Sequence, residues 1–288
     1  MASPGTLIAL SRPRHWVKNA FVLMPVPFAL KSGAHLDVQA FALGLAGFCL
    51  ANSAVYALND SLDAEADRSH PGKRHRPVAS GRISVGGARA FALLLVAGSL
   101  ALAWASHRPG VITLFAVYFG LNLLYSMHGR RVPLVDIFLL SAGYVIRVLL
   151  GCALVEARAS NWLLLCTSTL ALFLALAKRR ADVVAGIDAQ HRPSLAGYSE
   201  SFLDQAMVVM IAASLISYAL YCIEGGVLAV GREFATLPFV AFGVLEYLRL
   251  VHAHGAGGRP VDVLLTSPRL LLAGIGWSAA ALWSVGLW

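Results

Sequence analysis

Charge is the property that this sequence has least of. Asp, Glu, Lys and Arg together make up 13% of its 288 residues, whereas 58% of the residues are hydrophobic. Soluble globular domains carry about 25% charged residues. The composition therefore excludes an ordinary soluble domain and indicates a protein that crosses a membrane several times.

Cysteine motifs and a signal peptide are also missing. The 4 cysteines, Cys49, Cys152, Cys166 and Cys222, all fall within apolar runs, and no two of them form a CxxC pair. This excludes a zinc site of the cysteine-pair kind and favours small, unreactive core residues. Segment 1–19 lacks the basic, apolar and small-residue order of a cleaved signal, so we expect it to remain in the protein.

Long apolar runs are abundant. Nine of them can be read at 20–31, 40–58, 88–105, 111–127, 132–154, 161–177, 206–223, 233–251 and 270–288. A membrane-spanning helix needs about 20 apolar residues. We therefore predict an all-α fold, a single-domain bundle of about nine transmembrane helices over residues 1–288. Pro25 and Pro27 interrupt the first run, so we expect its helix to be kinked or tilted.

The positive charges predict an orientation. With nine spans and a cytoplasmic N-terminus, the outside segments hold only Lys31, Arg108, Arg158 and Arg232, and one span holds Arg147. The other 18 of the 23 Lys and Arg residues then lie inside. Because cytoplasmic loops are enriched in Lys and Arg, we expect a cytoplasmic N-terminus and an external C-terminus. Nucleic acid is excluded as a partner, since these charges are divided among short loops rather than laid along one face.

An acidic motif follows the second apolar run. Asn59 and Asp60 come directly after the run, and Asp63 and Asp67 continue the spacing i, i+3, i+7. On a helix these three aspartates share one face, where like charges repel unless a cation lies among them. Magnesium prefers one or two carboxylates together with substrate phosphates. The motif predicts a magnesium site for a phosphorylated substrate; the alternative is a solvated helix end neutralised by nearby arginines.

A basic run continues from the acidic motif. Its members are Arg68, His70, Lys73, Arg74, His75 and Arg76. Arginine can hold a phosphate as a bidentate fork and lysine as a point charge. The run therefore indicates a phosphate site beside the metal, whereas the alternative is an ordinary positive loop at the cytoplasmic surface.

A second large loop opens with three consecutive cations. Lys178, Arg179 and Arg180 stand at the end of an apolar run, and Asp182 and Asp188 follow them. We expect these cations to form the second wall of an anion site facing the first loop. The alternative is that they anchor the end of the span at the membrane surface.

Other candidate substrate-binding residues lie at the same predicted surface. They are Lys18, Tyr125, Arg130, Arg131 and Tyr198. Arg147 lies inside a predicted span, eleven residues after Asp136, so the two share a helix face about three turns apart. An arginine within a membrane is a functional or paired charge by default. The sequence leaves open an ion pair with Asp136 and a contact to a lipid phosphate.

These segments resemble the UbiA superfamily of intramembrane transferases. The acidic motif matches the pattern N-D-x-x-D-x-x-x-D of that superfamily. One branch, the decaprenyl-phosphate phosphoribosyltransferases, is resembled more specifically, and the resemblance runs from residue 8 to about 205. The segments that carry it are RPRHWVKN at 12–19, DRSHPGKRHRPVASG at 67–81, YSMHGRRVPLVD at 125–136 and LAKRRADV at 176–183.

The resemblance implies a reaction and its partners. The enzyme would transfer 5-phosphoribosyl from phosphoribosyl diphosphate to a polyprenyl phosphate and release diphosphate. Mg²⁺ would be held by Asp60, Asp63 and Asp67, which would be the catalytic residues. The protein would lie in a bacterial-type inner membrane, and a homo-oligomer is left open.

One departure from the superfamily bears on the substrates. Aromatic prenyltransferases carry a second aspartate-rich motif, whereas the corresponding loop here reads KRRAD. A cationic second wall favours two phosphorylated substrates over a prenyl diphosphate and a phenol such as 4-hydroxybenzoate, which is the alternative reaction. A transporter or lipid-binding protein is the third hypothesis. It would place polar residues near the bilayer midplane, whereas the charges here gather at one surface.

Overall fold

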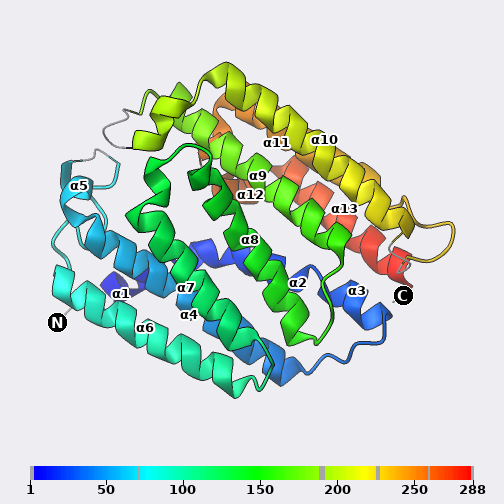
Figure 1. Ribbon diagram of the computed structural model, residues 1–288, viewed down its shortest axis with the longest axis horizontal. Coiled ribbons are helices and arrows are strands. Elements are labelled where there is room, and N and C mark those ends of the chain that lie inside the picture. The colour runs from blue at the N-terminus through cyan, green and yellow to red at the C-terminus, as the bar shows by residue number, and fades with distance from the viewer. Residues whose placement is uncertain (1–2, 70–71, 188–191, 225–227, 259, 287–288) are drawn as a thin grey trace.

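The computed structural model describes residues 3–69, 72–187, 192–224, 228–258 and 260–286, and every regular element among them is a helix (Figure 1). The long helices are α4 (Val38–Leu62), α6 (Val85–Ala105), α7 (Val111–Met127), α8 (Val135–Leu154), α9 (Asn161–Val184), α10 (Glu200–Glu224), α11 (Leu237–His254) and α13 (Pro268–Val285). The short α-helices are α1 (Pro4–Ser11), α2 (Ala20–Leu23), α3 (Val26–Lys31), α5 (Ala64–Ser69) and α12 (Pro260–Thr266). The 3₁₀ helices are η1 (Pro13–Asn19), η2 (Gly129–Arg131), η3 (Pro193–Gly197) and η4 (Ala256–Gly258). The predicted all-α fold is confirmed.

The predicted count of nine membrane spans is not confirmed. Among the described residues, α4, α6, α8, α9 and α10 are each long and apolar enough to cross a membrane, and α12 with α13 forms a sixth candidate bent by 82°. Helix α7 has 17 residues. The first predicted run is two short helices, α2 and α3, on either side of Pro25. Proline cannot donate a backbone hydrogen bond, so the run breaks rather than only kinking.

The helices pack in two groups joined by α8. In Figure 1, α4, α6 and α7 lie together on one side, and α9, α10, α11 and α13 lie on the other. One apolar core is centred on Phe48, Phe115 and Leu150, and a second on Phe173 and Met207. Helix α8 supplies residues to both cores, so it fixes the two groups relative to each other.

Glycine allows α2 to approach α8 closely. A Cβ atom at Gly151 would collide with the backbone carbonyl of Val22 in α2. Because the side chain is only hydrogen, the short broken segment packs directly against the central helix. This contact brings the segment that precedes α2, which includes Lys18, to the middle of the bundle.

The end of α4 positions the acidic motif. Asp37 caps the N-terminus of the helix by accepting a hydrogen bond from the amide of Ala40 at 3.0 Å. The helix ends at Leu62, and Asp63 is its C-terminal cap with non-helical backbone angles. Asp67 then lies in the separate helix α5. The expected continuous helical face through the three aspartates is therefore wrong, because the chain leaves the helix within the motif.

Candidate active site

A cavity of about 870 Å³ lies where the C-terminal ends of α4 and α9 meet the first half of α8. Most of the predicted site residues line it. They are Lys18, Asn59, Asp60, Asp63, Asp67, Lys73, Arg76, Tyr125, Arg130, Arg131, Arg147 and Lys178. The structure therefore brings residues from five separate stretches of the chain to one polar chamber.

Asp60 and Asp67 form one acidic wall of the cavity. The Nη2 atom of Arg12 donates to Asp60 Oδ1 at 2.5 Å, and Arg76 Nη1 lies 3.3 Å from Asp60 Oδ1 and 2.7 Å from Asp67 Oδ2. Arg12 has a left-handed backbone with φ 49°, a conformation that non-glycine residues adopt at a cost. Arg12 and Asp60 both line the cavity.

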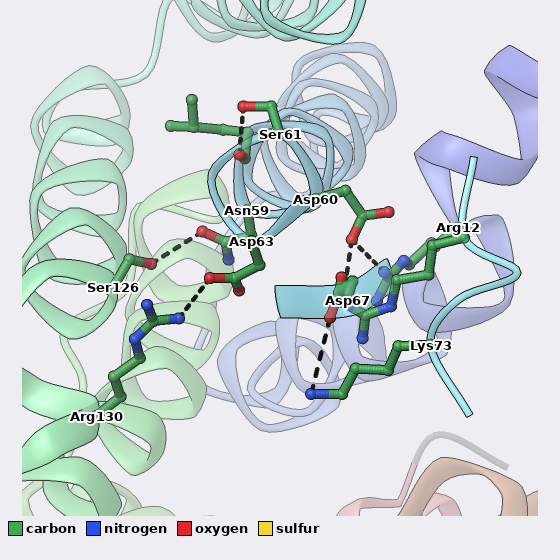
Figure 2. Close-up of polar contacts among 11 residues, drawn as sticks. Arg12, Asn59, Asp60, Ser61, Asp63, Asp67, Lys73, Ser126 and Arg130 are labelled. Carbon is green, nitrogen blue, oxygen red and sulfur yellow. Dashed lines mark hydrogen bonds and ion pairs between the residues drawn. The ribbon is translucent and has the colours of Figure 1, made fainter. Parts of the chain in front are cut away.

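Asp63 points away from the other two carboxylates. Figure 2 shows Asp60 and Asp67 directed toward Arg12 and Lys73, with Asp63 directed toward Arg130. Arg130 Nη1 donates to Asp63 Oδ1 at 2.7 Å. On the same side, Ser126 donates to the side-chain oxygen of Asn59 at 2.9 Å. The carboxylates thus flank the end of α4 and line the cavity from two directions.

The carboxylates fit a metal ion only with help from a substrate. Asp60 Oδ2 is buried, and no hydrogen-bond partner for it lies among the described residues. In the described part of the chain, no three Asp, Glu, His or Cys side chains lie close enough to hold a metal ion together. Magnesium takes one or two protein carboxylates and fills its other positions with phosphate oxygens and water. The donor set therefore suits magnesium that arrives with a phosphorylated ligand.

The three cations at the end of α9 point in different directions. Lys178 lines the cavity. The Arg179 side chain is fully buried and donates to Asp136 Oδ2 at 2.5 Å and to Asp182 Oδ2 at 3.1 Å. Arg180 forms ion pairs with carboxylates of α10, and it lies outside the cavity lining, as Arg179 does. Of the three consecutive cations that we expected to form a wall, only Lys178 lines the cavity, and Arg192 from the same loop lines it as well.

Arg147 does not pair with Asp136. Asp136 accepts hydrogen bonds from Arg179, from Ser194 Oγ at 2.9 Å and from Tyr198 Oη at 2.6 Å. Eleven residues along a helix rise about 16 Å, which is too far for a direct contact. The ion pair that the sequence left open for Arg147 is therefore excluded. Burial and the hydrogen bond to Asp136 raise the pKa of Tyr198, so its hydroxyl remains a neutral donor.

Within the described residues, the hydrogen-bond partners of Arg147 are all neutral. Its Nε donates to Asn19 Oδ1 at 3.1 Å, its Nη1 to the Gly143 carbonyl at 2.6 Å and its Nη2 to Asn52 Oδ1 at 2.5 Å. The guanidinium also lies over three aromatic rings. These are Phe48 at 5.3 Å, Tyr118 at 5.5 Å and Tyr144 at 5.6 Å. Contacts of this kind hold the cation in place without neutralising it.

Several predicted residues lie elsewhere. Arg68 and Arg74 are exposed and outside the cavity lining, and Tyr198 is part of the buried Asp136 network. His70 and Asp188 fall outside the described residues.

Our sequence analysis missed three residues near the cavity as site candidates: Arg12, Asn52 and Tyr144. Tyr144 precedes Arg147 by three residues, so helical spacing could have placed the two on one face. Asn52 is a polar side chain within an apolar run, which is itself a signal. Arg12 begins the segment RPRHWVKN that carries part of the family resemblance, but its contact with Asp60 spans 48 residues and could not be read from spacing.

A second, apolar cavity of about 410 Å³ adjoins the first. It lies among α2, α3, α9, α10, α11, α12 and α13, and aromatic side chains such as Phe21, Phe173 and Trp277 line it. Lys18 and Tyr144 line both cavities. The polar and the apolar cavity therefore adjoin each other at Lys18 and Tyr144.

Comparison with known proteins identifies the family. The UbiA prenyltransferase family matches residues 20–257. Decaprenyl-phosphate phosphoribosyltransferase of Corynebacterium glutamicum is 32% identical over 94% of this chain and 84% of its own length. The protein of the same name from Mycobacterium tuberculosis is 33% identical over 96% of this chain and 94% of its own length.

The fold is also similar to that of solved UbiA structures. A solved UbiA homologue from Archaeoglobus fulgidus, bound to GPP and Mg²⁺, superposes with a TM-score of 0.72 and covers 97% of this chain and 99% of its own chain at 19% identity. Several apolar helices and this likeness indicate an integral membrane protein. Because the family match spans most of the chain, this protein belongs to the UbiA prenyltransferase family.

Proposed function

We propose that this protein transfers a 5-phosphoribosyl group from phosphoribosyl diphosphate to a polyprenyl phosphate. A lipid phosphate oxygen forms a bond to C1 of the ribose, while the bond from C1 to the diphosphate breaks and its electron pair leaves with the diphosphate. The observation that carries the proposal is the pair of adjoining cavities. One is polar, with acids on one wall and unneutralised cations such as Lys178 and Arg147, and the other is apolar. The names of the curated relatives support the same reaction.

The acidic wall is proposed to bind the donor. Asp60 and Asp67 would hold magnesium together with diphosphate oxygens, in line with the Mg²⁺ bound by the homologue from A. fulgidus, and Asp63 would face the same ligand from the other side of the cavity. When bound, magnesium neutralises charge that develops on the leaving diphosphate. Lys73 and Arg76 already lie within 4.0 Å and 2.7 Å of Asp67, so a diphosphate beside that carboxylate would meet both cations.

Positioning is the main task left to the protein. The lipid phosphate is already an anion, so it needs no strong general base. Holding it in line with C1 converts a reaction between two molecules into one within a complex, which accelerates the reaction greatly. Phosphoribosyl diphosphate is water-soluble and would enter from the cytoplasm, with the N-terminus on that side and the C-terminus outside, in a bacterial-type inner membrane.

A transfer assay tests the proposal directly. Purified protein, polyprenyl phosphate, Mg²⁺ and radiolabelled phosphoribosyl diphosphate should yield label in the organic phase, and EDTA should abolish this transfer. The organic phase reports product because only the lipid product partitions there. No transfer, with a prenyl diphosphate and 4-hydroxybenzoate reacting instead, would contradict the proposal and favour the aromatic prenyltransferase.

The apolar cavity is proposed to hold the start of the polyprenyl tail. Gly274 lines this cavity, and a Cβ atom built there meets no atom within 4 Å. Gly274→Leu should therefore fill the cavity without disturbing the helix, and should raise KM for the polyprenyl phosphate about tenfold, equivalent to about 1.4 kcal/mol. KM for phosphoribosyl diphosphate should stay within about twofold.

Gly120→Leu is the matched control for this substitution. Gly120 also lies within an apolar helix with open space at its Cβ position, but it lines neither cavity. Its two KM values should not change. If both variants raised KM for the lipid equally, the tail would not lie in the apolar cavity.

A further inference from the structure

The cations of the polar cavity fall into two groups. Arg12, Lys73, Arg76 and Arg130 each form an ion pair with an aspartate of the acidic motif, and Arg192 forms one with Asp182. A second group, Lys18, Arg147 and Lys178, lines the same cavity, is not exposed, and makes no ion pair within the described part of the chain. Arg131 also lines the cavity without an ion pair there, but its side chain is exposed to solvent. We call this second group the unpaired cations.

Arg147 shows why this group requires an anion. Its side chain is buried in the middle of α8, and its three hydrogen-bond acceptors are neutral. Guanidinium does not lose its proton in proteins, so the charge persists in place. A buried charge without a counter-ion is costly, and the cost is greater within a membrane. A bound anion would remove that cost and would use the guanidinium N–H groups that remain.

The ammonium group of Lys18 is repelled by the positive charge of Arg147. Burial lowers the pKa of Lys18, and the charges of Arg147 and Arg12 lower it further. The nearby phenol of Tyr144 is the group that acts in the opposite direction. Lys18 and Arg147 therefore repel each other across a space that an anion would occupy favourably, and Lys178 of α9 borders the same chamber.

The location distinguishes this site from the acidic wall. Lys18 and Tyr144 line both the polar and the apolar cavity. An anion at the unpaired cations would thus lie where an attached apolar chain could pass directly into the second cavity. A ligand with one phosphate and a long hydrocarbon tail matches this arrangement, whereas the wholly polar donor does not.

We infer that Lys18, Arg147 and Lys178 bind the phosphate group of the acceptor lipid, a phosphate monoester, at the junction of the two cavities. This assignment rests on the proposed function and deepens it. The donor diphosphate then occupies the opposite, acidic wall near Asp67 and Lys73. The two phosphorylated substrates are kept apart by the sign of the protein charge around each: carboxylates that take a metal on one side, and cations alone on the other.

Equilibrium binding without donor or metal tests the inference. Polyprenyl phosphate should bind the purified protein at least tenfold more tightly than polyprenol of the same chain length. Lys178→Met and Lys18→Met should each weaken binding of the phosphate about tenfold and leave polyprenol binding unchanged, because methionine keeps the apolar stem and removes the charge. The lysines carry the test because Arg147 is buried and its replacement also tests folding.

Two controls define the specificity of the effect. Arg89 is exposed and lines neither cavity, so Arg89→Met removes the same net charge and should leave lipid binding unchanged. Inorganic phosphate should fail to displace the lipid at concentrations equal to it. Displacement at that concentration would overturn the assignment of the site to a lipid headgroup.

Steady-state kinetics provide the second readout. In Lys178→Met, KM for polyprenyl phosphate should rise about tenfold with KM for phosphoribosyl diphosphate within twofold, and Lys73→Met should show the opposite pattern. A rise in the donor KM for Lys178→Met would overturn the inference. If the wild-type protein transfers phosphoribosyl but Lys18→Met and Lys178→Met bind polyprenyl phosphate as tightly as the wild type, only this inference is refuted. Lysine-dependent lipid binding without any transfer would refute only the proposed function.

Discussion

Asp60→Asn should reduce phosphoribosyl transfer about a hundredfold or more, the size of effect seen when one group that stabilises a developing charge is removed. Asp60 is 2% exposed, and its Oδ2 atom meets no hydrogen-bond partner in the part of the chain that the structure describes. Asparagine has nearly the same volume and still accepts hydrogen bonds from Arg12 and Arg76 through its oxygen. The substitution therefore removes the negative charge and one metal-binding oxygen with little change in packing.

The magnesium dependence identifies the cause of this loss. If Asp60 holds the metal, the Mg²⁺ concentration that gives half-maximal activity should rise in Asp60→Asn together with the fall in kcat. A rate assay over a range of Mg²⁺ concentrations measures both quantities. Thermal stability in detergent should stay close to that of the wild type.

Glu65→Gln is the matched control. Glu65 lies in α5 between two aspartates of the motif, but it is exposed and outside the cavity lining. Glu65→Gln changes the net charge of the segment by the same amount as Asp60→Asn. Activity should be retained in Glu65→Gln. Equal activity in Asp60→Asn and the wild type would remove the metal-site proposal.

Hydropathy predicted the helices well where lipid and core packing decide the structure. The range 111–127 coincides with α7, and the other apolar runs except the first fall mostly within single helices. It predicted α9 poorly at its C-terminus, because the helix runs past the apolar limit at 177 to Val184. The added turns contain Arg179 and Arg180, whose charges are neutralised by carboxylates from other helices. A window over one segment cannot foresee such partners.

The sequence predicted most residues that line the cavity, but not which way their side chains point. Contiguous sequence suggested that Lys178, Arg179 and Arg180 act as one cationic wall. Consecutive residues on an α-helix are rotated by about 100° from each other, so three in a row point in three directions. Only tertiary contacts decide which one reaches the cavity: Asp136 takes Arg179 and α10 takes Arg180, which leaves Lys178.

The need for tertiary contacts also explains why the sequence did not decide the partner of Arg147. Its helix contains one carboxylate, Asp136, on the same face. The sequence does not show whether a residue from another helix pairs with that carboxylate. Arg179 does so from α9. The assignment of each acid to its cation is a property of the packed bundle, and the lipid-phosphate site that we propose consists of cations left without a carboxylate partner among the described residues.

Arg179→Met should destabilise the protein by about 3–5 kcal/mol, the usual cost of removing one partner of a buried ion pair. Asp136 and Arg179 are both 0% exposed, so the carboxylate would be left buried without its charged partner. The midpoint of thermal loss of monodisperse protein in detergent measures this effect. Arg180→Met is the adjacent control: its partners Asp204 and Glu200 are 34% and 53% exposed, so water can solvate them and the loss should be about 1 kcal/mol or less.

A second substitution separates a structural role of Arg179 from substrate binding. Asp136→Asn combined with Arg179→Met removes the stranded charge, so the double variant should be more stable than Arg179→Met alone. Such recovery follows only if the destabilisation arises from the unpaired carboxylate. If Arg179→Met kept wild-type stability and instead raised KM for either substrate, Arg179 would contact that substrate directly. The cationic run would then act as one wall after all, because a ligand would have drawn Arg179 away from Asp136.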